Sequence, residues 1–156
     1  MDIFIDGEWN GYGGQLISMA LCAEDGREWY EVLQCEQPCP WVEENVMPIL
    51  NKTPIAYSDF QESLKEFLGQ FDSVTIIADW PEDIERFCAA LITGPGERLD
   101  TPPLRMEIQR IDAGSEQPHN ALADARGIRM ALRPFGGTPP TEEPKTVVPR
   151  LKQPIA

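Results

Sequence analysis

The amino-acid sequence predicts an α/β fold, a mixed β-sheet with antiparallel first three strands, flanked by helices. Three observations lead to this prediction. Strand-like apolar runs separated by turn residues fill the N-terminal part, and amphipathic helical patterns alternate with short apolar runs after it. The length of 156 residues fits one domain with a core of ordinary size.

The first three predicted strands follow one another closely. Residues 3–5 are β-branched and aromatic, and residues 16–22 are almost continuously apolar, as in a strand buried on both faces. The glycines of residues 11–14 indicate the turn between these strands, since no Lys-Ser or Lys-Thr follows that would make a phosphate loop. Residues 24–26 then form a hairpin turn, and residues 28–33 form the returning strand.

Helices and further strands alternate in the rest of the chain. Pro40 and Pro81 suit the first turns of two helices, and either Ser58 or Asp59 is the expected cap of another. The predicted helices span residues 41–50, 60–71, 81–92 and 120–132, and the predicted later strands span 74–78 and 105–111. The resulting order, β-β-β-α-α-β-α-β-α, predicts a sheet with helices packed on it.

The charge is strongly negative and unevenly distributed. The formal net charge is −13, which argues against a groove binder that relies on neutralising many phosphates. Residues 1–125 hold 24 acids and 7 bases, whereas residues 126–156 hold 2 acids and 6 bases. We therefore expect a domain over residues 1–133 and a proline-rich extended arm over 134–156. The arm is either a disordered tail or a segment lying on a neighbouring subunit, where residues 146–148 could pair with a strand edge.

The sequence predicts a cytoplasmic protein with reduced thiols. Cys35 and Cys39 have no second cysteine pair to complete a zinc site, so free, partly buried thiols are expected. No apolar run reaches the roughly 18 residues that a membrane span needs. The N-terminus begins with acidic residues where a signal peptide would carry basic ones.

Paired carboxylates are the first indication of chemistry. Asp6 and Glu8 end the first strand, and because side chains alternate in a strand, both project from the same face. The single histidine, His119, precedes Asp124 by five residues at the start of the last predicted helix. Either motif alone is common in surface segments, but the two together point to a shared site.

These motifs resemble those of the DEDDh exonucleases, and the match is closest to the small bacterial 3′-to-5′ exoribonucleases. Residues 4–8 are similar to the first motif, an apolar strand ending in Asp-x-Glu, although Gly7 stands where Thr is common. Residues 119–125, His-Asn-Ala-Leu-Ala-Asp-Ala, match the third motif without a gap. The resemblance covers about residues 2–132 and implies a ribonuclease H-like sheet.

The second family motif is an apolar strand followed by an Asp in the first turns of a helix. Asp83 is the expected counterpart, and Asp79 is the alternate if the strand ends later. Asp79 with Glu82 also looks like a capping box, which would give Asp79 a structural role, whereas we expect no structural role for Asp83.

The resemblance implies a metal-dependent 3′-to-5′ exoribonuclease that releases nucleoside 5′-monophosphates from single-stranded RNA or short oligonucleotide 3′ ends. Such hydrolysis uses two divalent ions about 3.5–4 Å apart, and oxygen ligands favour Mg²⁺ or Mn²⁺. The implied metal ligands are Asp6, Glu8, Asp83 (or Asp79) and Asp124, and His119 is the implied general base, a role that suits a pKa near 6.5.

Three points stay open at the level of sequence. Trp9 either stacks on the terminal base or belongs to the core. Members of the family are commonly dimers, which implies a homodimer here. The alternative functions are a 3′-to-5′ DNA exonuclease and a non-catalytic acidic binding module on the same fold, and the latter would require a broken metal-ligand position.

Overall fold

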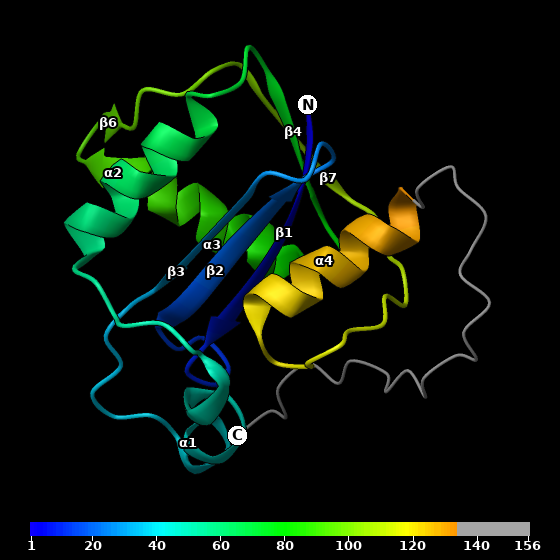
Figure 1. Cartoon of the computed structure of the whole chain (residues 1–156). Coiled ribbons are helices and arrows are strands. Elements are labelled where there is room, and N and C mark those ends of the chain that lie inside the picture. The colour runs from blue at the N-terminus through cyan, green and yellow to red at the C-terminus, as the bar shows by residue number, and fades with distance from the viewer. Residues whose placement is uncertain (134–156) are drawn as a thin grey trace, which may run out of the picture.

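The structure, a computed structural model, describes residues 1–133, and residues 134–156 with the predicted arm lie outside the described part. A five-stranded mixed sheet is its centre, in the order β3-β2-β1-β4-β7 (Figure 1). The strands are β1 (Asp2–Trp9), β2 (Leu16–Ala23), β3 (Glu28–Val32), β4 (Val74–Ala78) and β7 (Leu104–Ile108).

The two halves of the sheet differ in direction. β1 pairs antiparallel with β2, and β2 pairs antiparallel with β3, so the antiparallel arrangement holds for both neighbouring pairs of the first three strands. On its other edge β1 pairs parallel with β4, which pairs parallel with β7. The carboxyl ends of β1, β4 and β7 therefore meet at one end of the sheet, where ligands bind in many α/β proteins.

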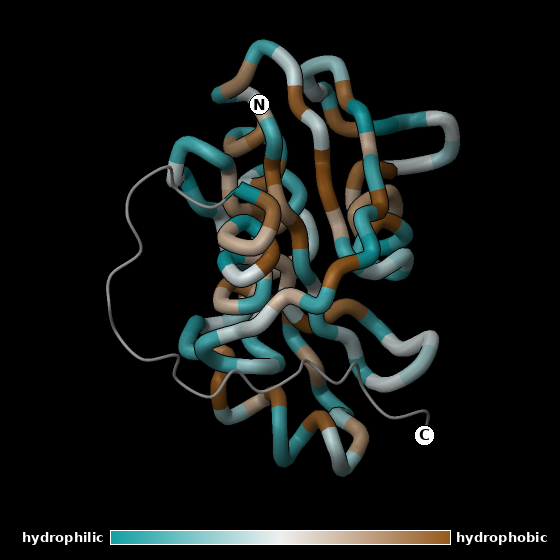
Figure 2. The backbone as a smooth tube through the Cα atoms, turned by 90° about the vertical axis from the view of Figure 1, so that its right-hand side faces the viewer, coloured by the Kyte–Doolittle hydropathy of each residue, from teal (hydrophilic) through white to brown (hydrophobic). Residues whose placement is uncertain are grey.

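Helices cover both faces of the sheet (Figure 1). α2 (Tyr57–Leu68) and α3 (Pro81–Leu91) pack on one face, where Phe60 and Phe87 join Ile3 and Ile5 in the largest buried cluster. α4 (Ala121–Leu132) packs on the other face, where its Ile128 meets Phe4 and Ile77 of the sheet. Hydrophobic stretches accordingly run along the central strands in Figure 2.

Shorter elements complete the described part. α1 (Pro40–Asn45) and the 3₁₀ helix η1 (Met47–Ile49) follow β3, and β5 (Ile92–Gly94) with β6 (Glu97–Arg98) forms a small hairpin after α3. The sequence predicted one helix over 41–50 and did not predict the β5–β6 hairpin. The single long helix was wrong because Pro48, which has no N–H to donate, lies near the end of that range, and the chain changes there to the separate turn η1.

The second helix also begins earlier than predicted. α2 starts at Tyr57 behind Ala56, whose side chain makes no capping hydrogen bond, so the expected cap at Ser58 or Asp59 was wrong. α2 ends at Leu68, before Gly69. The apolar side chains of Leu64, Phe67 and Leu68 are buried, and they decide which face of α2 meets the sheet.

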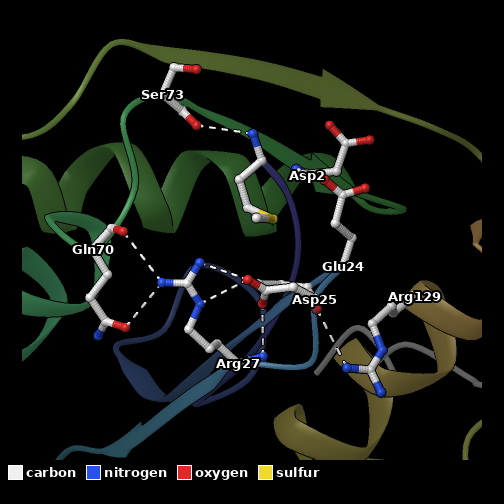
Figure 3. A network of polar contacts seen from close by, with 9 residues as sticks. Asp2, Glu24, Asp25, Arg27, Gln70, Ser73 and Arg129 are labelled. Carbon is white, nitrogen blue, oxygen red and sulfur yellow. Dashed lines mark hydrogen bonds and ion pairs between the residues drawn. The ribbon is translucent and has the colours of Figure 1, made fainter.

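A polar network ties the β2–β3 turn to the segment before β4 at the amino-terminal end of β1 (Figure 3). Arg27 forms an ion pair with Asp25 at 2.7 Å and donates to the backbone carbonyl of Gln70. The N-terminal ammonium group donates to the carbonyl of Ser73 at 3.0 Å. These contacts hold the end of the sheet that lies away from the carboxyl ends of β1 and β4.

Part of the basic C-terminal region belongs to the domain. Arg126 and Arg129 lie on α4, and Arg126 makes a 2.6 Å ion pair with Glu28 of β3. These two arginines of the basic C-terminal region are therefore part of the folded domain. No helix within residues 1–133 combines the length and the apolar character that crossing a bilayer requires.

Candidate metal centre

Asp6 and Glu8 lie side by side on the face of β1 that α4 covers. Both are buried, with exposed fractions of 0% and 4%. They follow Phe4, which packs against α4, and the alternation of the strand places all three on one face. Small side chains on β2 and α4, Ala20 and Ala121 among them, form a cluster beside them and let α4 come close.

Asp124 reaches this pair from the first turn of α4. Its exposed fraction is 1%, and its Oδ2 accepts a hydrogen bond from the backbone N–H of His119 at 3.1 Å. The N-cap residue Asn120 accepts a hydrogen bond from the N–H of Ala123 and donates one to the carbonyl of Ile49. The cap therefore fixes both the start of α4 and the position of Asp124.

Asp83 approaches from the opposite side of β1. It is fully buried in the first turn of α3, and its Oδ1 accepts a hydrogen bond from the backbone N–H of Gly7 at 3.0 Å. This contact joins α3 to β1 between Asp6 and Glu8. The expectation that Asp83 has no structural role was therefore wrong.

The expectation that Asp79 is the N-cap of α3 was wrong. The N-cap of α3 is Trp80, with no side-chain capping hydrogen bond, and Pro81 occupies the first turn as predicted. β4 ends at Ala78, so Asp79 is the single residue between this strand and the N-cap. Asp79 is half-buried.

The five carboxylates form two groups that share one member. Ligand oxygens of Asp6, Glu8 and Asp124 lie within 4.8 Å of one another, and so do those of Asp6, Asp79 and Asp83. Ionised carboxylates this close repel each other, so a bound cation would offset a considerable electrostatic cost. The donors are all oxygen atoms, which fits Mg²⁺ or Mn²⁺ better than a softer metal.

His119 lies beside the first group without belonging to it. Among the described residues, neither carboxylate group includes a histidine nitrogen atom or a cysteine sulfur atom. The backbone of His119 has a φ of 70°, in the left-handed region where histidine is one of the more tolerated residues. Its ring packs edge to face against Trp41 of α1, with centroids 4.9 Å apart.

Trp9 follows Glu8 at a register irregularity of β1 and is only 4% exposed. The guanidinium of Arg86 lies 5.9 Å from the centre of its ring. A base could stack on Trp9 only after a neighbouring side chain moves. The stacking role of Trp9 stays a prediction.

Two neighbours of the site were not found from the sequence. Trp41 contacts the ring of His119, and the carbonyl of Ile49 anchors the amide of Asn120. Both belong to the α1–η1 segment, which carries no motif and is distant from His119 in the chain. The only signal in the sequence is Pro40, which suits the first turn of a helix and would place Trp41 at the start of that helix.

No protein-family model and no curated protein matches this chain. The site is therefore defined by its own geometry, which consists of buried carboxylates from β1, α3 and α4 and one histidine at the start of α4.

Proposed function

We propose that this protein is a metal-dependent 3′-to-5′ exoribonuclease of the DEDDh type on a ribonuclease H-like fold. The single observation that carries the proposal is the position of Asp6 in both carboxylate groups. A carboxylate shared in this way suits a pair of divalent cations, one in each group. The sheet order and the resemblance of residues 119–125 to the third family motif support the same assignment.

The side chains would have separate roles in this reaction. Glu8 and Asp124 would hold one cation together with Asp6, and Asp79 and Asp83 would hold the other, again together with Asp6. Two bound divalent ions would lower the pKa of the attacking water and stabilise the leaving oxygen of a phosphodiester. His119 would accept the proton of the attacking water, since an imidazole is a base near neutral pH.

The negative charge of residues 1–125 favours short substrates or strand ends. Residues 1–125 carry 24 acids against 7 bases, so a long polyanion would be repelled outside the site. Cations held in the carboxylate groups would attract one or two phosphates at a chain end. Single-stranded RNA and short oligonucleotides are the substrates that fit this charge distribution, with release of nucleoside 5′-monophosphates.

A non-catalytic acidic module on the same fold is the competing proposal. It would require a missing metal-ligand position, but Asp6, Glu8, Asp83 and Asp124 are all buried and grouped. This grouping favours the enzyme. A homodimer and a DNA substrate remain proposals that rest on resemblance.

Incubation with 5′-labelled single-stranded RNA and Mn²⁺ tests the proposal. Stepwise shortening from the 3′ end that stops on chelation supports it, and an equal-length DNA strand in the same assay separates RNA from DNA exonuclease activity. Intact RNA, or shortening that is unchanged in His119→Ala, would refute it.

A further inference from the structure

A pocket of about 400 Å³ opens beside the second carboxylate group. Asp79 lines it and also belongs to the group with Asp6 and Asp83, so the pocket and the group adjoin at this residue. The other lining residues are Trp80 and Pro81 at the start of α3 and, from the chain after β7, Ile108, Arg110, Ile111, Asp112 and Ala113. Its volume falls in the range of small-molecule sites.

The strand pairing explains why the pocket lies there. β4 and β7 run parallel, with Ala78 paired to Ile108, and the N–H of Gln109 donates to the carbonyl of Ala78 at 2.8 Å. Both chains leave the sheet at this point, one toward α3 and the other toward the segment before α4. The pocket thus occupies the carboxyl ends of two adjacent parallel strands.

The lining combines an aromatic surface, aliphatic side chains, one cation and the carboxylates of Asp79 and Asp112. Trp80 is 40% exposed, and its indole N–H donates to Glu82 Oε2 at 3.0 Å, which restrains the ring. Ile108 is 52% exposed. The exposed Arg110 has no ion pair with any residue in the described range 1–133.

We propose that this pocket binds one nucleotide unit of the substrate strand, with its base stacked on Trp80 and its phosphate near Arg110. The inference rests on the proposed function and specifies where the strand lies next to the carboxylate groups. A flat base fits a restrained indole, and stacking of this kind tolerates any base sequence. A guanidinium suits a phosphate because it offers several donors in one plane.

Binding and turnover of Trp80 variants test the inference. Dissociation constants for a short labelled RNA and a DNA of the same sequence are measured by fluorescence anisotropy with Mn²⁺, in a His119→Ala background that keeps every carboxylate. We expect Trp80→Ala to weaken binding about tenfold and Trp80→Phe to restore most of it. Arg110→Gln should weaken binding and reduce its dependence on salt.

Matched controls come from surfaces away from the pocket. Met130→Ala removes a 57% exposed side chain on α4, and Arg98→Gln removes an exposed charge on β6. Both should leave the dissociation constants unchanged. With His119 present, Trp80→Ala should raise KM for the oligonucleotide with little change in kcat, because the ring would touch the strand and not the reacting atoms.

The outcomes separate this inference from the proposed function. Hydrolysis of RNA with the same dissociation constant in Trp80→Ala and Met130→Ala would overturn the pocket and leave the exonuclease in place. Binding that depends on Trp80 without any hydrolysis would keep the pocket and refute the exonuclease. If the parent chain binds no RNA, both proposals are overturned. If Trp80→Ala changes the oligomeric state but not RNA binding, this surface contacts a second copy of the chain instead of RNA.

Discussion

The carboxylate of Asp83 accepts a hydrogen bond from the backbone N–H of Gly7 at 3.0 Å. This contact fixes α3 against β1 at the residue between Asp6 and Glu8. Asp83 therefore has two separable roles, because its oxygen accepts a hydrogen bond and its charge contributes to the second carboxylate group.

Substitutions at Asp83 can separate these two roles. Asp83→Asn keeps an oxygen acceptor for Gly7 but removes the charge, so we expect activity to fall roughly 10–100-fold with little loss of stability. Asp83→Ala leaves the buried N–H without its acceptor and should also lower the free energy of unfolding by roughly 1–3 kcal/mol. Urea denaturation and the RNA shortening assay measure the two effects.

The matched comparison is Asp79→Asn. Asp79 shares the second group but is half-buried, whereas Asp83 is fully buried, so loss of the Asp79 charge should reduce activity less than Asp83→Asn does. Full activity in both variants would show that the second group takes no part in the reaction.

The carboxylate groups should also couple metal binding to stability. A cation that binds only the folded chain adds about 2.7 kcal/mol at 100 times its Kd, which corresponds to a Tm increase of roughly 5–10 °C for a chain of this size. We expect this increase with Mn²⁺ and its loss in Asp6→Asn, measured by thermal unfolding with and without a chelator. An equal Tm in Mn²⁺ and chelator would show that no cation binds the folded chain.

The ion pair between Glu28 and Arg126 should contribute stability that depends on pH. The hydrogen bond from Arg126 lowers the pKa of Glu28 below its ordinary 4.5, so the contribution is present above that value and is lost as the pH falls through the lower, folded value. Arg126→Gln should cost up to about 1 kcal/mol of unfolding free energy near neutral pH and less near pH 3. Urea unfolding at both pH values checks this, with Arg98→Gln as the control. An equal loss at the two pH values would contradict the assigned cause.

Cys22 should be the least reactive of the four thiols. Its burial, followed by the nearby charge of Glu28, raises its pKa to about 12, so little thiolate forms near neutral pH. Alkylation followed by peptide mass mapping should label the half-buried Cys39 and Cys88 before Cys22. Rapid labelling of Cys22 in the folded chain would contradict its buried position.

The sequence predicted the sheet and the three carboxylates of the first group because these depend on local patterns. Residues 74–78 are a strand as predicted, and strand alternation places Asp6 and Glu8 together. The helix start at Asn120 brings Asp124 to them. Each of these features is set within one element or by one cap.

Contacts between distant segments could not be read from local patterns. The hydrogen bond from Gly7 to Asp83, the packing of Trp41 on His119 and the shared position of Asp6 all depend on how elements meet in space. The interpretation of Asp79 as a capping residue failed for a related reason. A capping pattern does not tell which of two adjacent residues is the actual N-cap.

The number of bound Mn²⁺ ions tests the central claim, that Asp6 joins two metal-binding groups, most directly. Calorimetric titration of the purified chain should give two ions per chain. Glu8→Gln should remove one of them and Asp6→Asn should weaken both, because Glu8 belongs to one group and Asp6 to both. A single ion in the parent chain, or two ions that persist unchanged in Asp6→Asn, would contradict the account.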